Sequence, residues 1–167
     1  MADINRQTDM LFSDLEKYYQ NNNAGNIKYF DDDGIEGVDY YVGKDTNIKY
    51  KKFKTKAEGL SDIANTIKNI SNRLNTNSLK EIMQTYASDD ASGKRFEEYE
   101  PRLKNIFKIP DEINLEDDEQ VKRLIMGITD VENPTLDRPE LNHNKYYFET
   151  DYDDAVRLFK DPITAME

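Results

Sequence analysis

The sequence contains no cysteine, no tryptophan and a single histidine, His143. Without cysteine the chain has no disulfide bond, no thiolate zinc site and no cysteine nucleophile. One histidine also excludes a histidine-rich metal site. The acidic run that begins at Asp31 does not fit a calcium-binding EF-hand loop, because Val42 occupies the position where that loop needs a glutamate. We therefore predict no metal site, and no organic cofactor is implied.

Long apolar runs are also absent, and none approaches the ~20 residues that a membrane-spanning helix needs. The net charge of −11 disfavours binding to nucleic acid, which requires a positive surface. It equally disfavours attraction to an anionic membrane surface. A length of 167 residues is typical of one domain, so we predict a single domain over residues 1–167. Eleven tyrosines and seven phenylalanines supply apolar area for its core.

Apolar residues recur with helical spacing through most of the chain. The clearest stripe contains Leu60, Ile63, Ile67 and Ile70. Thr55 and Glu58 before it have the spacing of a capping box, in which each side chain bonds the other residue's backbone N–H, and Ser78 and Glu81 repeat that spacing. Pro101 must kink or begin the helix in which it lies. The predicted helices cover residues 6–20, 56–74, 79–86, 96–106, 117–131 and 150–160.

A short region between the first two helices alternates apolar and polar residues. Val38, Tyr40 and Val42 alternate, as do Ile48 and Tyr50, with the turn-forming sequence Gly-Lys-Asp-Thr-Asn between the two runs. This pattern predicts a small β-hairpin. The predicted fold class is therefore α+β and predominantly α-helical.

Glu132 is the acidic residue whose position indicates chemistry most directly. It lies at the end of the predicted 117–131 helix, just before Asn133 and Pro134. The carboxyl end of a helix carries partial negative charge, so the neutral carboxylic acid is favoured there when the group is also desolvated. A neutral acid is what general-acid cleavage of a glycosidic bond requires. The alternative interpretation is a solvated glutamate at an ordinary helix end.

An ordered set of short segments resembles a family of phage muralytic proteins with lysozyme or lytic transglycosylase domains. The segment "NNNAGNI" at residues 21–27 resembles the family's "NNPGNI", and "TDVEN" at 129–133 resembles its closing "HENG". Between them lie "FKTKAEGL", "SLKEIMQTYA", "YEPRLKNIFKIP" and "INLEDDEQVKRLIMGI", which resemble further family segments in the same order. The resemblance covers residues 20–133. An N-terminal helix at 6–20 and an extension at 134–167 lie outside it.

The resemblance implies a lysozyme-like fold whose chain order is circularly permuted, with Glu132 as the catalytic acid. The segment near residue 25 would then line the substrate beside Glu132. Implied substrate contacts are Asn22, Asn23, Gly25 and Asn26, with Gly25 allowing close backbone approach. Tyr86 and Tyr99 match family tyrosines, and could bond Glu132 or the substrate, or could serve as core residues with a wet hydroxyl.

The function implied by the resemblance is cleavage of peptidoglycan glycan strands by a protein of the phage virion, acting in the host periplasm or cell wall. Its partners would be the glycan and other virion proteins. Because Glu132 stands alone, we favour the lytic transglycosylase reaction over two-carboxylate hydrolysis, for which Asp33 or Glu36 would be the second acid. Two further alternatives are an inactive structural virion protein and a glycan-binding module, both with the same fold.

Overall fold

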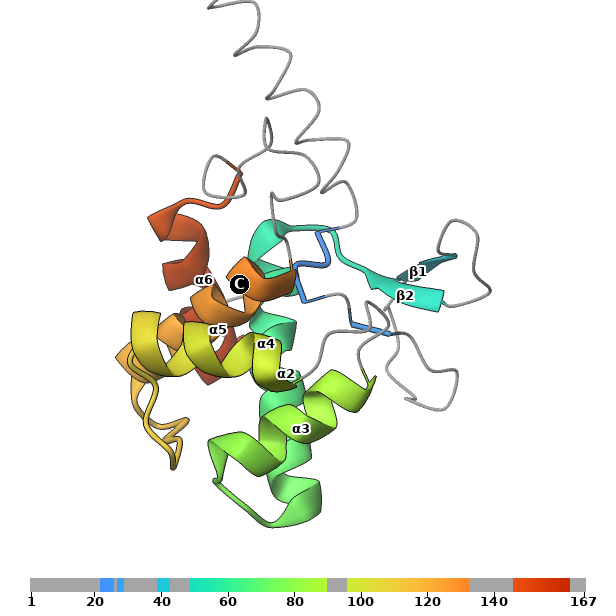
Figure 1. The fold of residues 1–167 in the computed structure, drawn as a ribbon. Helices are drawn as coiled ribbons and strands as arrows, with labels where there is room; N and C mark the ends of the chain where they lie inside the picture. The colour runs from blue at the N-terminus through green and yellow to red at the C-terminus, as the bar shows by residue number, and fades with distance from the viewer. Residues whose placement is uncertain are drawn as a thin grey trace, which may run out of the picture.

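The computed structural model describes residues 22–25, 27–28, 39–42, 49–89, 96–132 and 146–162. Helices predominate in this part of the chain, as the sequence predicted (Figure 1). The elements in chain order are β1 (Asp39–Val42), β2 (Lys49–Lys52), α2 (Lys56–Leu74), α3 (Leu79–Asp89), α4 (Phe96–Glu100), the π-helical segment η2 (Pro101–Ile106), α5 (Asp118–Glu132) and α6 (Glu149–Lys160).

The helix α2 forms where the apolar stripe predicted it, and its buried face includes Leu60, Ile63 and Ile67. Thr55 caps its amino end by accepting a hydrogen bond from the backbone N–H of Glu58 at 3.1 Å. The return bond of a capping box, from the Thr55 N–H to the Glu58 carboxylate, is absent from this turn. Asn75, in the left-handed conformation, ends the helix.

The second predicted capping box is also only half formed. The Ser78 hydroxyl accepts a hydrogen bond from the backbone N–H of Glu81 at 3.3 Å, and α3 follows. The Glu81 carboxylate instead accepts a bond from the Thr76 hydroxyl, which in turn accepts one from the backbone N–H of Ser78. The Thr76 hydroxyl thus accepts the bond from the Ser78 N–H that the Glu81 carboxylate would accept in a full capping box.

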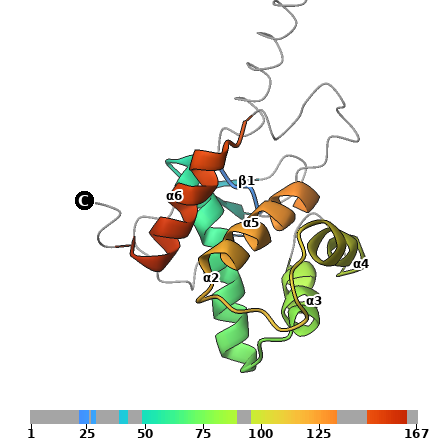
Figure 2. The same ribbon diagram turned by 90° about the vertical axis from the view of Figure 1, so that its left-hand side faces the viewer.

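The helices α5 and α6 pack against α2 and against each other (Figure 2). α2 and α6 run in the same direction. Lys56 at the start of α2 lies 4.0 Å from the ring centre of Tyr146, and Lys68 further along lies 5.8 Å from that of Phe159. α5 runs opposite to α6, since Asp118 at its start pairs with Lys160 at the end of α6.

Proline divides the helical region that packs on the other side of α5. α4 ends at Glu100, and η2 begins at Pro101, which cannot donate a backbone hydrogen bond to the preceding turn. η2 lies so close to α5 that a Cβ atom at Gly127 would be 2.6 Å from Cδ2 of Leu103. Gly127 therefore permits the contact that aligns α4 and η2 with α5.

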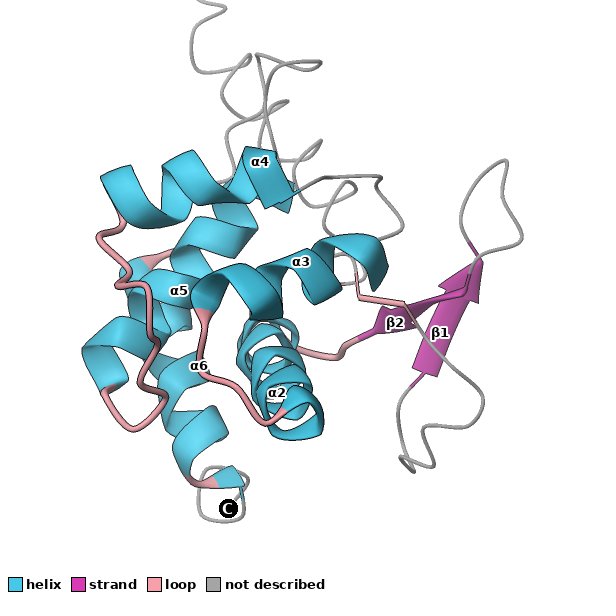
Figure 3. Ribbon diagram, turned by 60° about the horizontal axis from the view of Figure 1, so that its bottom comes forward, coloured by secondary structure: helices cyan, strands magenta, loops and turns pink. Residues whose placement is uncertain are grey.

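The strands stand apart from the helices (Figure 3). β1 pairs with β2 in antiparallel fashion, with Tyr41 opposite Tyr50. On the other edge of β2, the backbone N–H of Lys51 donates to the carbonyl of Ile27 at 3.0 Å, and Lys28 forms a bridge with Tyr50. The predicted hairpin region therefore also holds the segment that follows Gly25.

Some sequence predictions fall outside the described residues. These are the helix at 6–20, the hairpin turn at 43–47 and the first part of the 134–167 extension, as far as residue 145. The predicted helix at 150–160 begins one residue earlier, at Glu149, and the predicted helix at 117–131 extends to Glu132. The last change matters, because it makes Glu132 a helical residue with a fixed backbone.

Candidate active site

Glu132 is the last residue of α5, and only 4% of its surface is exposed. The hydroxyl of Tyr99, a fully buried residue of α4, donates a hydrogen bond to Oε1 of Glu132. A carboxylate at the carboxyl end of a helix faces the negative end of the helix dipole, so an external donor is needed to stabilise its ionised form. Tyr99 is such a donor and is at the same time a fully buried core residue, so it combines both features that the sequence left open for it.

Tyr86 lies next to Tyr99 and contacts Gly25, which is near the start of the region that resembles the muralytic family. The two rings meet edge to face, with centres 5.9 Å apart and planes at 85°. The Tyr86 hydroxyl donates to the backbone carbonyl of Gly25 at 2.9 Å. Tyr86 and Tyr99, together called the tyrosine bridge below, thus connect Gly25 with Glu132. The described turn and the end of α5 lie on the same side of the helices in Figure 1.

Gly25 is required by close packing. A Cβ atom at this position would lie 2.7 Å from Oη of Tyr86 and 2.8 Å from Cγ1 of Ile63. Both distances are shorter than ordinary non-bonded contacts allow. The glycine that the sequence analysis placed beside a substrate is therefore explained by its contact with the tyrosine bridge and with α2.

The side-chain amides of Asn22 and Asn23 are occupied within the protein. Asn23 donates to the carbonyls of Ile27 and Lys51, each at 2.9 Å, and accepts from the N–H of Ile27 at 2.8 Å. Asn22 donates to the carbonyl of Phe53 at 3.2 Å. The resemblance implied that these amides contact sugar hydroxyls, but the hydrogen bonds instead fasten the turn to β2. Asn26, the third predicted asparagine, lies outside the described residues.

Two residues that the sequence analysis did not assign to the site hold Asn22 in place. Asn22 has a φ of 53°, in the left-handed region that asparagine tolerates. A Cβ atom at Gly59 would lie 1.6 Å from the carbonyl oxygen of Asn22, so α2 needs glycine at this position. The hydroxyl of Tyr146 donates to Oδ1 of Asn22 at 3.1 Å. In the sequence, the one sign of the contact between Gly59 and Asn22 was the presence of a glycine inside a strongly helical pattern.

The other acidic residue near the end of α5 is engaged elsewhere. Asp130 forms an ion pair with Arg102 of η2, with 2.7 Å between Oδ2 and Nη1. The negative charge of Asp130 also contributes, after burial, to raising the pKa of the Tyr152 phenol above its ordinary value. Asp33 and Glu36, which the sequence offered as partners of Glu132, lie outside the described residues.

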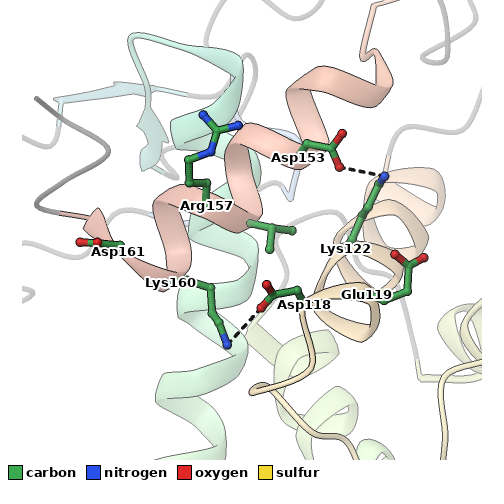
Figure 4. Close-up of a pocket in the computed structure, with 8 residues that line it drawn as sticks. Asp118, Glu119, Lys122, Asp153, Arg157, Lys160 and Asp161 are labelled. Carbon is green, nitrogen blue, oxygen red and sulfur yellow. Dashed lines mark ion pairs between the residues drawn. The ribbon is translucent and has the colours of Figure 1, made fainter.

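The opposite end of α5 carries a highly charged hollow of about 380 Å³ against α6 (Figure 4). Lys122 spans it to Asp153 at 2.9 Å and also contacts Glu149, while Lys160 reaches Asp118 at 3.1 Å. Hydrogen bonds that Lys122 donates to Glu149 and that Lys160 donates to Asp118 raise the pKa values of these two lysines. Because their charges are already neutralised by these acids, the two lysines serve to tie the helices together.

The described part of the chain lacks two further features, a membrane-spanning helix and a cluster of metal ligands. None of its helices has both the length and the apolar character needed to cross a membrane. Within the same residues, no cluster of three or more histidine, aspartate or glutamate side chains is arranged to hold a metal ion. The chain matches no protein-family model and no curated protein sequence.

Proposed function

We propose that this protein cleaves the glycan strands of peptidoglycan as a lysozyme-like lytic transglycosylase of a phage virion, with Glu132 as its general acid and base. The observation that carries the proposal is the buried Glu132 at the end of α5, bonded by the Tyr99 hydroxyl. The resemblance to phage muralytic proteins independently assigns the acid to this residue. The connection of Gly25 to Glu132 through the tyrosine bridge agrees with the permuted order that the resemblance implies.

In the first step, the Glu132 carboxylic acid gives its proton to the glycosidic oxygen that leaves C1 of the muramoyl residue. Burial favours the neutral acid before this step, because an ion is poorly solvated inside the protein. The Tyr99 hydroxyl favours the carboxylate that remains afterwards, because it donates a hydrogen bond to Oε1. Burial thus favours the protonated form and the Tyr99 bond favours the ionised form. A group that serves first as acid and then as base needs both forms to be accessible.

In the second step, the carboxylate takes the proton from the C6 hydroxyl of the same muramoyl residue. The oxygen of that hydroxyl forms the new bond to C1, and the product is a 1,6-anhydro sugar. The substrate itself holds this nucleophile close to C1, so no second carboxylate is needed to position water. The ion pair between Asp130 and Arg102 supports this route, because it engages the described acid that is nearest to Glu132 in sequence.

The turn at residues 22–25 has a positioning role in this proposal. Its asparagine amides bond backbone carbonyls of Ile27, Lys51 and Phe53, and its glycine packs on Tyr86 and Ile63. A turn fixed in this way can present the residues that follow it to the glycan without loss of order on binding. The described amides themselves would not be the sugar ligands.

Digestion of purified peptidoglycan followed by mass spectrometry tests the proposal. We expect products that carry 1,6-anhydromuramoyl ends and are lighter by one water than hydrolysis products. New reducing ends would show that a hydrolase with a second carboxylate is the correct alternative, with Asp33 or Glu36 as its candidate. Binding to the wall without any cleavage would identify a glycan-binding module, and neither binding nor cleavage would identify a structural virion protein.

A further inference from the structure

An exposed phenylalanine lies beside a lysine at the amino end of α6. Phe148 is 52% exposed, whereas aromatic side chains of this size are usually buried. The ammonium nitrogen of Lys56 lies 5.3 Å from the centre of its ring. Single exposed apolar residues are common and need no explanation by themselves. The surroundings of Phe148, however, combine three features that favour the binding of a ligand.

The first feature is a rigid backbone under the exposed ring. Phe148 is the amino-terminal cap residue of α6, and its backbone N–H donates to Oδ2 of Asp151 at 2.8 Å. Its carbonyl accepts from the Asp151 N–H at 2.9 Å. A ring on a fixed backbone loses little conformational freedom when a ligand covers it, so it is a low-cost binding surface.

The second feature is a cation with remaining donor capacity. Lys56 donates one hydrogen bond, to the carbonyl of Tyr146 at 2.6 Å, and its nitrogen is 3.9 Å from a carboxylate oxygen of Asp151. An ammonium group has three N–H donors. Its side chain is 27% exposed, so solvent or a ligand reaches it. The cation lies close to the rings of both Tyr146 and Phe148.

The third feature is proximity to the candidate site. Tyr146, whose ring contacts Lys56, also bonds the side chain of Asn22. Asn22 begins the turn that the tyrosine bridge connects to Glu132. A polymer that occupies the candidate site has further sugar units on both sides of the cleaved bond, so a contact surface beside the turn lies where such units can bind.

We propose that Phe148 and Lys56 form an accessory subsite for a muramoyl residue of the glycan, an inference that rests on the proposed function. The apolar face of the sugar ring stacks on Phe148. The carboxylate of the lactyl group or of the attached stem peptide pairs with the Lys56 ammonium. An aromatic face next to a cation matches a pyranose that carries an acid, and a plain N-acetylglucosamine polymer would use only the aromatic half.

Binding measured apart from cleavage tests the subsite. Cosedimentation with purified peptidoglycan is carried out in a Glu132→Gln background, so that the wall stays intact. We expect Phe148→Ala to weaken binding about tenfold, equivalent to the loss of one good contact. Lys56→Gln should weaken it roughly threefold at low salt and not at all at 1 M salt, where charges are screened. With chitin, only Phe148→Ala should have an effect.

The chain offers matched controls for both changes. Lys68→Gln removes a lysine that faces the aromatic ring of Phe159 on the same pair of helices, and Ile106→Ala removes an exposed apolar side chain from η2. Both should bind like the parent, and thermal unfolding should confirm that every variant is folded.

The outcomes separate the subsite from the proposed function. Phe148→Ala binding as tightly as Ile106→Ala would overturn the subsite, whatever the enzyme activity. Normal binding by the parent, weakened as expected by both changes but without any cleavage by the wild type, would support the subsite and overturn the catalytic proposal. Failure of the parent to bind peptidoglycan would overturn the subsite and argue against a glycan substrate.

Discussion

The two ends of α5 place acidic residues in opposite environments. At the carboxyl end Glu132 is buried and accepts a hydrogen bond from the hydroxyl of Tyr99. At the amino end Asp118 is largely exposed and faces Lys160 across a charged hollow. In an ideal helix these ends are about 20 Å apart. The comparison teaches that Glu132 is distinguished by its desolvation and by a buried hydroxyl donor, since charged side chains are abundant throughout this protein.

The largest expected effect is on activity at the buried end. Glu132→Gln should lower peptidoglycan clearance by about a thousandfold, because proton transfer by a positioned group commonly contributes 10²–10⁴-fold. The fold should be retained, since glutamine has nearly the same shape and can still accept the Tyr99 hydrogen bond. Turbidity clearance with circular dichroism measures both properties. Glu119→Gln, at the exposed end of the same helix, is the control and should remain active. Undiminished clearance by Glu132→Gln would end the assignment of the acid.

The next effect concerns the close packing behind the buried end. Gly59→Ala should destabilise the protein by about 2–3 kcal/mol, because the added methyl group would overlap the carbonyl of Asn22. In an unobstructed helix the same change would stabilise by nearly 1 kcal/mol, so the sign of the effect is informative. Urea unfolding gives the free energy, with Asn65→Ala on the exposed face of α2 as the control. A more stable Gly59→Ala variant would mean that the turn at residue 22 does not pack on α2.

A smaller effect should separate the two members of the tyrosine bridge. Tyr99→Phe removes the donor to Glu132 and should lower activity about tenfold, with a stability loss of about 1–2 kcal/mol for the lost buried hydrogen bond. Tyr86→Phe removes the donor to the Gly25 carbonyl and should cost similar stability with a weaker effect on activity. Steady-state clearance rates and urea unfolding of both variants test this order. Equal loss of activity in the two variants would indicate a purely structural role for Tyr99.

The smallest effect is expected at the charged end. Lys122→Met should cost less than about 1 kcal/mol at low salt, and the loss should shrink as salt is added, because ion pairs with solvent-exposed acids such as Glu149 and Asp153 contribute little. The pKa of Lys122 is raised above its ordinary 10.5, so its contribution to stability is present below that pH and is lost only as the pH rises further. Unfolding at pH 7 and pH 9 should therefore give the same difference between variant and wild type. A large loss of unfolding free energy at pH 7 would show that the contacts at the charged end stabilise the protein as strongly as those at the buried end.

The elements of the fold were more predictable than the contacts of the site. Periodic apolar residues were sufficient for α2 and α5, because a buried stripe on one face leaves little choice of structure. The resemblance directed attention to Glu132, but its hydrogen bond with Tyr99 depends on how α4 packs against α5. The internal hydrogen bonds of Asn22 and Asn23 could not be predicted, because they depend on where the folded chain places backbone carbonyls such as those of Lys51 and Phe53. Tyr146 lay outside every recognised motif, so no sequence pattern connected it with Asn22.

The hydrogen bond between Asn22 and Tyr146 joins residues that are 124 positions apart. On a ribosome the first of these emerges long before the second, so this contact cannot form until nearly the whole described chain has been synthesised. Closing a loop of this length also carries an entropic cost, which the surrounding packing must offset. We therefore expect nascent and truncated chains that lack residue 146 to hold the turn beside Glu132 loosely. Under the proposed function, chains that end before residue 146 should therefore also be less active than the whole chain.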